Sequence, residues 1–227
     1  MSYFDQFSRL FADYDVVGAF WVNIQLTFWA AVFAFLIGAL VALMRISPVP
    51  SLRLLGGAYV HIVRNTPLTI LMVMAVLALW TQMHITLSTD FKQNFFNFAV
   101  AMLSIYHAAF VCEAIRSGVN TVPLGQAEAA RSIGLGFLPT ARLIIFPQAI
   151  RGAITPLGNA LIALTKNTTV AAAASVAEAS VMMKKMIEFD SDVIFAIFMT
   201  FALGFVIIVI PVGLITTWAS RKWAVKR

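Results

Sequence analysis

Residues 125–147 read GQAEAARSIGLGFLPTARLIIFP, the longest stretch in which charged residues interrupt an otherwise apolar sequence. Pro123, just before it, suits the first position of a helix, and the alanines that follow have high helix propensity. Gly134 and Gly136 then favour a turn, because glycine readily adopts positive φ. The pattern predicts a helix, a glycine turn, and a second short helix that runs from about Pro139 to Ile145 and ends before Pro147.

These two helices are too short and too polar to cross a bilayer, which takes about 20 apolar residues. Glu128, Arg131 and Arg142 all fall within them. We therefore expect the pair to lie in water on one side of a membrane, where it can bind another protein. A solvated loop without a partner is the plainer interpretation of the same residues.

The composition places most of the remaining chain inside a membrane. Hydrophobic residues make up 61% of the 227 residues and charged residues 11%, whereas soluble domains are about one-quarter charged. This length predicts one helical domain, residues 1–227, without room for a nucleotide-binding domain. The sequence contains no phosphate-binding G-x-x-x-x-G-K-[ST] motif. We therefore expect no cofactor in this chain, and we expect any ATP and Mg to be bound by a partner.

Five stretches with few or no charges are long enough to span a bilayer, so the predicted fold is an all-α membrane protein. Residues 1–15 differ, because Phe7, Leu10, Phe11 and Tyr14 recur there at helical spacing among charged residues. They predict an amphipathic helix at the outer interface. The predicted spans are residues 16–44, 60–83, 95–116, 149–171 and 193–219, with a polar loop at 117–148 and a short helix or re-entrant segment at 172–192.

Basic residues are distributed unevenly between the ends of these spans. If the C-terminus is cytoplasmic, 11 of the 16 Lys and Arg residues face inward and four face outward, with Lys166 inside a span. The positive-inside rule therefore predicts an outer N-terminus and a cytoplasmic C-terminus, which puts the 117–148 loop in the cytoplasm. Because the charges lie at helix ends and form no single stripe, we do not expect nucleic-acid binding. The inward group includes Arg45, Arg53, Arg64, Arg116, Arg131, Arg142, Arg151, Arg221, Lys222, Lys226 and Arg227.

The stretch quoted first also carries a family resemblance. Glu128-Ala129-Ala130, Gly134 and Ile144-x-Phe146-Pro147 resemble the EAA motif of ABC importer permeases, E-A-A-x3-G-x9-I-x-L-P, with Phe146 in place of leucine. The resemblance implies a type I ABC importer (MetI-like) fold, with five transmembrane helices and cytoplasmic coupling helices that contact an ATPase. It assigns ATPase coupling to Gly125, Gln126, Glu128, Ala129, Ala130, Arg131, Gly134 and Pro147.

Polar residues inside the predicted spans are candidates for the solute path. In HIVRNTPL, residues 61–68, a proline breaks the helix and frees a backbone carbonyl group. The residues Asn65, Thr66 and Pro67 either satisfy that freed backbone or face the solute. The segment is similar to the R-G-T-P-L of the polar amino-acid branch of these permeases, with Asn65 in place of glycine.

Glu113 is an acid near the inner end of a span, where an ionisable group is costly unless it is paired or hydrated. It either lines the solute path, or holds a group that moves during gating, or forms a structural ion pair with an arginine such as Arg64 or Arg116. Residues 159–170 resemble the N-x-x-I-x-L-x-K-x-T-S-L of the same branch, with Thr169-Val170 in place of Ser-Leu. The lysine of this segment, Lys166, serves packing, pairing or solute contact. The candidate path residues there are Asn159, Lys166, Thr168 and Thr169.

Over most of its length, the chain is similar to the glutamate permease subunits of actinobacterial ABC importers. The resemblance implies a multi-pass protein of the bacterial cell membrane that imports a polar amino acid, L-glutamate, at the expense of ATP hydrolysed elsewhere. It also implies a sister permease in a homodimer or heterodimer, two ATPase subunits and an extracellular solute-binding protein. We expect no catalytic or metal site. The alternative is an ion-coupled secondary amino-acid transporter in which Glu113 and Lys166 form a relay.

Overall fold

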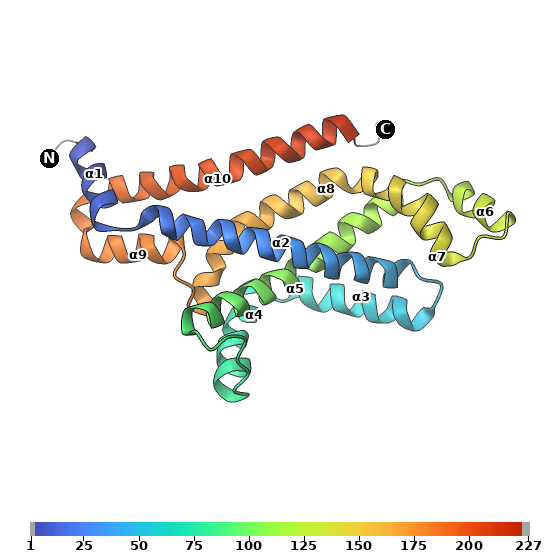
Figure 1. The fold of residues 1–227 in the computed structure, drawn as a ribbon, viewed down its shortest axis with the longest axis horizontal. Coiled ribbons are helices and arrows are strands. Elements are labelled where there is room, and N and C mark those ends of the chain that lie inside the picture. The colour runs from blue at the N-terminus through green and yellow to red at the C-terminus, as the bar shows by residue number, and fades with distance from the viewer. Residues whose placement is uncertain (1–2, 224–227) are drawn as a thin grey trace. The chain divides into compact units, whose positions relative to one another are not determined.

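The computed structural model describes residues 3–223, and the regular elements in that range are all helices. Residues 1–2 of the predicted N-terminal helix, and Lys226 and Arg227 of the basic C-terminus, lie outside the described residues. In chain order (Figure 1) the elements are α1 (Tyr3–Asp13), α2 (Val16–Ile46), α3 (Pro50–Asn65), α4 (Leu68–Met74), η1 (Ala75–Gln82), α5 (Phe91–Val119), α6 (Leu124–Ser132), α7 (Phe137–Thr140), η2 (Ala141–Ile145), α8 (Phe146–Asn167), η3 (Thr168–Ala174), α9 (Ala179–Phe189), η4 (Ser191–Val193) and α10 (Ile194–Trp223).

Three stretches of helix in the described chain are long and apolar enough to cross a membrane. Two further pairs of helices pass the same test together, which gives up to five spans if each pair counts as one broken span. The three are Val16–Ile46, Phe91–Val119 and Ser191–Trp223, and the pairs are Pro50–Asn65 with Leu68–Gln82 and Phe137–Ala174 with Ala179–Phe189.

The predicted second span, 60–83, differs most from the structure. The helix α3 begins at Pro50, well before the predicted start at residue 60, because proline fits the first helical position. The chain then leaves the helix at Thr66, which is extended with φ −98° and ψ 126°, and Pro67 precedes α4. The residue before a proline is disfavoured in the helical region, so the break falls where the sequence predicts it.

The chain divides into two compact units, each assembled from separate stretches. Neither is a continuous domain, since both take residues from the beginning, middle and end of the sequence. Unit 1 contains the described parts of Met1–Ala30, Pro67–Leu103 and Ala163–Pro211, and unit 2 those of Ala31–Thr66, Ser104–Ile162 and Val212–Arg227.

In unit 1, α1 is fastened to the turn that precedes α10. Arg9 forms an ion pair with Asp190, and the Tyr14 hydroxyl donates a hydrogen bond to the same carboxylate at 2.5 Å. This hydrogen bond to Asp190 raises the pKa of Tyr14 above its ordinary value, so the neutral phenol remains the donor at physiological pH. The apolar side of α1 completes a core whose buried members are Leu10, Val16, Ala179, Met186, Val193, Ala196, Ile197 and Phe201.

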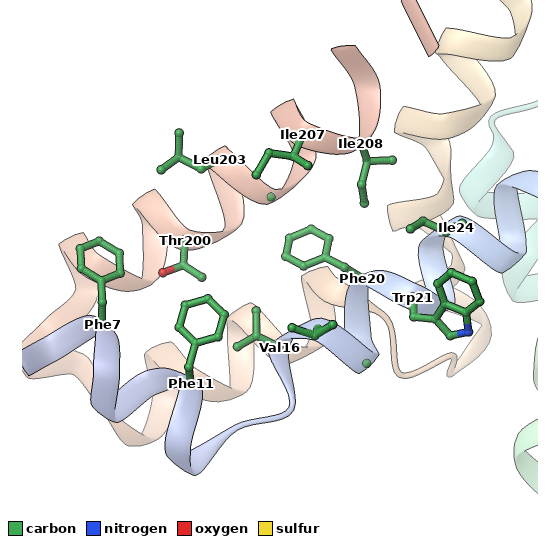
Figure 2. A pocket seen from close by; sticks show the side chains of 13 residues that line it. Phe7, Phe11, Val16, Phe20, Trp21, Ile24, Thr200, Leu203, Ile207 and Ile208 are labelled. Carbon is green, nitrogen blue, oxygen red and sulfur yellow. The ribbon is translucent and has the colours of Figure 1, made fainter. Parts of the chain in front are cut away.

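An apolar groove of about 670 Å³ runs along α1, α2 and α10 in unit 1. Figure 2 shows aromatic rings from α1 and α2, among them Phe11 and Phe20, opposite aliphatic side chains of α10. Gly204 permits this approach, because a Cβ there would lie 2.1 Å from Cζ of Phe20. An open surface of this kind is stable against lipid chains and unfavourable in water, which agrees with the predicted spans.

Candidate functional site

The polar stretch of residues 125–147 lies in unit 2, where its first part folds as α6, and α6 ends in a glycine turn. Gly134 has φ +84°, a conformation that L-residues with side chains rarely adopt. Its N–H donates to the carbonyl oxygen of Arg131, and the N–H of Leu135 donates to that of Ala130, both at 3.0 Å. These two bonds form a Schellman motif, so the predicted glycine turn is confirmed. Pro123 lies one position earlier than predicted, as the residue that caps α6.

The second helix of this hairpin was predicted to run from about Pro139 and to end before Pro147, and that prediction is wrong. The helix begins at Phe137, and it passes through the π-helical turn η2 into α8 without a break. In η2 the N–H of Phe146 donates to the carbonyl oxygen of Ala141, five residues back. This wider register accommodates Pro147, which has no N–H of its own.

The side chains of α6 divide between solvent and the interior of unit 2. Gln126, Glu128, Ala129 and Arg131 are exposed, whereas Ala130 is only 2% exposed. The two alanines of the motif therefore have different roles in this structure. Ala130 packs within the chain, where α6 contacts α7 and η2, and only Ala129 is open to a partner.

Large apolar side chains are also exposed on the hairpin formed by α6, α7 and η2, which Figure 1 shows at the start of α8. Leu124 is 84% exposed, and Ile133 is 76% exposed. Leu138 and Leu143 are exposed as well. Apolar groups left open in a polar loop are typical of a surface that another protein covers.

The two spans that flank the hairpin touch at glycines. A Cβ on Gly118, near the end of α5, would lie 2.1 Å from the carbonyl oxygen of Ala149 in α8. A Cβ on Gly152 would lie 2.4 Å from Oγ1 of Thr121. Small residues let membrane helices approach this closely. The contact joins the end of α5 to the beginning of α8, so both ends of the hairpin are held together. The sequence reasoning missed this contact.

Glu113 forms ion pairs within unit 2. Its Oε2 accepts hydrogen bonds from Nε and Nη2 of Arg116 at 3.1 and 2.9 Å, and its Oε1 pairs with Arg45. The ion-pair interpretation is confirmed for Arg116. Arg64 is not the partner, because its guanidinium lies over the ring of Phe110, 5.3 Å from the centroid. Arg45 was missed as a partner, although it directly follows the first predicted span, 16–44, on the inner side, and Glu113 was placed near the inner end of its own span.

The other polar candidates in unit 2 are open or serve the backbone. Asn65 and Asn159 are exposed. The hydroxyl of Thr66 donates to the carbonyl oxygen of Ile62 at 2.9 Å, which supports its backbone role at the helix end.

In unit 1, Lys166 and Pro67 are exposed and Thr169 is half-buried, but Thr168 is fully buried. The hydroxyl of Thr168 donates to the carbonyl oxygen of Thr165 at 2.8 Å and accepts from Nδ2 of Asn23 at 3.0 Å. In this structure the Thr168 hydroxyl is therefore enclosed in unit 1 and bonded to its neighbours. Local reasoning could not predict this hydrogen bond, because Asn23 and Thr168 are 145 residues apart in the sequence.

The same network holds a buried carboxylate that sequence reasoning did not single out. Glu178 is 0% exposed and caps α9. Its oxygens accept from Nδ2 of Asn23 at 3.0 Å, from the N–H groups of Ser180 and Val181 at 2.9 and 3.2 Å, and from the Ser180 hydroxyl. Asn23 also accepts from the N–H of Ala179 at 3.0 Å. Within residues 3–223, no three His, Cys, Asp or Glu side chains are grouped as a metal site requires.

The binding-protein-dependent transport system inner membrane component family matches residues 34–225. The chain belongs to this family. A curated relative, the glutamate transport system permease protein GluC of Corynebacterium efficiens, is 48% identical over 227 residues, which cover 97% of this chain and 100% of that protein.

Two solved structures show the fold. An amino acid ABC transporter aligns with a TM-score of 0.80 at 23% identity, over 98% of this chain and 99% of that one. The MetNI methionine ABC transporter in an inward-facing conformation aligns with a TM-score of 0.72 at 19% identity, over 92% and 96%. The predicted type I ABC importer fold is confirmed.

The family fixes the general function. The chain is a membrane permease subunit of an ABC importer, a transport component without an enzymatic role. Permeases of this family work with ATPases and binding proteins in the inner membrane. This assignment favours the ATP-driven importer over the ion-coupled secondary transporter.

Proposed function

We propose that this chain is the permease through which an ATP-driven importer carries L-glutamate into a bacterial cell. The 48% identity to a glutamate transport permease along nearly the whole chain supports this substrate. The observation that carries the coupling to ATP is α6, a nine-residue helix with EAA spacing whose small and polar side chains are exposed.

The assembly that we infer contains a sister permease of the same fold, as a homodimer or a heterodimer. It also contains two ATPase subunits, which bind ATP and Mg, and an extracellular solute-binding protein. The distribution of basic residues supports an outer N-terminus and a cytoplasmic C-terminus. With that topology, α6 lies on the side where ATP is hydrolysed.

In the proposed mechanism, α6 docks in a cleft of an ATPase subunit. Ala129 allows close approach, while Gln126, Glu128 and Arg131 make contacts at the rim. Gly125 is open, with no atom within 4 Å of the position of a Cβ, and it leaves room for the partner's backbone. Closure of the ATPase dimer then moves the hairpin as a rigid body, since Gly134 fixes its turn and Pro147 lies where it joins α8.

The contact between Gly118 and Gly152 explains how this motion reaches the membrane. Because α5 and α8 touch there, the hairpin displaces the adjoining parts of both helices together. Solute contact is proposed for the exposed residues Asn65, Pro67, Asn159 and Lys166 and for the half-buried Thr169. Glu113 and Thr66 stabilise the walls of the path through the ion pairs and the hydrogen bond observed here. Thr168 contacts solute only in a conformation in which its hydrogen bonds to Asn23 and Thr165 are broken.

Uptake of labelled L-glutamate into vesicles tests this proposal. The chain is co-expressed with ATPase, sister-permease and binding-protein subunits, with aspartate and glutamine as competitors. We expect uptake that requires ATP and is inhibited most strongly by unlabelled glutamate. ATP-dependent uptake of another amino acid would overturn the substrate alone. Uptake that continues without ATPase and follows an ion gradient would overturn the mechanism.

A further inference from the structure

A cavity of about 520 Å³ lies in unit 2 behind the coupling hairpin. Its wall includes Ile46, the last residue of α2, and Val119, the last residue of α5. Both helices qualify as membrane spans. The cavity therefore lies where two spans leave the hydrocarbon region, at the depth of the lipid headgroups.

The cavity adjoins the proposed docking surface on α6 and shares Arg131 with its rim. Leu124, Ala127 and Arg131 line it, and their spacing of three and four residues places them on one helix face. Ala129 does not line it and points elsewhere on the helix. A ligand in the cavity therefore leaves Ala129 open to an ATPase.

The lining combines apolar walls with positive charge. Arg53 and Arg131 both border the cavity, and among the described residues neither has a carboxylate partner. Its described lining contains no Asp or Glu. Guanidinium groups with free donors match phosphate oxygens in geometry and charge.

One buried polar group in the wall also lacks a partner within the described chain. Thr140 is 7% exposed and lines the cavity, and its Oγ1 makes no hydrogen bond to the described residues. Buried hydroxyl groups are normally satisfied, so an unsatisfied one beside a cavity indicates a polar ligand. Arg53, Arg131 and Thr140 thus supply hydrogen-bond donors to the lining of the same cavity.

We propose that this cavity binds the headgroup of an anionic phospholipid. The phosphate contacts Arg53 and Arg131, and the glycerol and first acyl carbons lie on the apolar wall near Ile46 and Val119. Basic pockets next to spans on the cytoplasmic side are suited to such headgroups. The volume falls within the range of small-ligand pockets and fits a headgroup, not a whole lipid. A bound lipid ties α6 to the ends of α2 and α5.

The test counts lipids on the assembled transporter by native mass spectrometry, after exchange into matched phosphatidylglycerol or phosphatidylcholine. The variant is Arg53→Gln, and the control is Arg142→Gln, which removes an exposed arginine of the same hairpin that does not line the cavity. We expect wild type and control to retain phosphatidylglycerol in preference to phosphatidylcholine. Arg53→Gln should weaken retention about tenfold, the effect of one charge-assisted hydrogen bond.

A second variant, Ala127→Phe, fills the cavity without changing its charge and should lose the lipid in the same way. The proposal would be overturned if Arg53→Gln and Ala127→Phe retained as much phosphatidylglycerol as wild type does. It would also be overturned if Arg142→Gln lost as much phosphatidylglycerol as Arg53→Gln does. Displacement of the lipid by inorganic phosphate at the same concentration would also overturn it, because the ligand would then be a soluble phosphate. Lipid counts do not depend on which amino acid is carried, so these outcomes are separate from the proposed function.

Discussion

The helices α6 and α9 have similar lengths, 9 and 11 residues, but opposite designs. In α9 the carboxylates at both ends, Glu178 and Asp190, are buried and bonded within unit 1. In α6 no side chain caps the N-terminus, and Glu128 is exposed. A short helix whose polar groups are satisfied internally holds its own chain together, whereas one that leaves them open is suited to bind another chain.

The buried carboxylate of Glu178 is stabilised by hydrogen bonds within unit 1. Among the described residues no Lys or Arg pairs with this fully buried carboxylate, which four donors and the N-terminus of α9 stabilise instead. Glu113 in unit 2 is stabilised in a third way, by ion pairs with two arginines, Arg45 and Arg116.

The largest effect is expected where the hairpin turn is broken. Gly134→Pro removes the N–H that bonds Arg131 and cannot adopt φ +84°, at a local cost of about 1–3 kcal/mol. ATP-driven uptake should fall to background while the protein still inserts into the membrane. Gly136→Ala is the control, because Gly136 has φ −69° and the nearest atom to its added Cβ would be 4.0 Å away. Normal uptake by Gly134→Pro would contradict the role of the turn.

Replacing a glutamate by alanine at α9 and in α6 tests whether the two helices differ in how much their carboxylates stabilise the fold. Glu178→Ala leaves several buried donors without a partner and should lower the free energy of unfolding by about 3 kcal/mol. Glu128→Ala should change it by no more than about 0.5 kcal/mol, because the side chain is exposed. Unfolding of the purified protein measures both. Similar losses for the two variants would show that α6 is bonded internally as α9 is.

The glycine contact between α5 and α8 should respond to a single methyl group. Gly118→Ala places a Cβ 2.1 Å from a backbone oxygen and should cost about 2 kcal/mol. Gly57→Ala in α3 meets no atom within 4 Å and should be neutral or stabilising, since alanine favours helix. Thermal unfolding of the two variants makes the comparison. Equal stability would mean that the helices separate easily.

The smallest effect is expected at the partly exposed ion pairs. Arg45→Gln leaves Glu113 with Arg116, so the free energy of unfolding should fall by about 1 kcal/mol. Replacing both arginines removes every observed cation from Glu113 and should cost more than the sum of the single changes. A double-mutant cycle on the purified protein measures this coupling, and strict additivity would contradict the shared site.

The features that the sequence predicted are local. Long apolar runs identify the spans, Pro67 marks a helix break, and Gly134 marks a turn that needs positive φ. Pro147 misled local reasoning, because the π-helical turn before it lets the helix continue.

The features that were missed depend on residues far apart in sequence. Arg45 and Glu113 are separated by 68 positions and Asn23 and Glu178 by 155. The motif Glu-Ala-Ala identifies α6, but only tertiary packing decides that Ala130 is buried and Ala129 exposed. The spacing of the motif therefore does not show which of its residues contact an ATPase.

The central claim is that the exposed face of α6 docks on an ATPase, and Ala129→Asp tests it most directly. The measurement is ATP-driven uptake in proteoliposomes, together with the amount of ATPase that copurifies with the permease. We predict that Ala129→Asp loses both while the permease inserts normally, and that the control Ala129→Ser retains both because its side chain stays small. Normal uptake and a full complement of ATPase in Ala129→Asp would contradict the account.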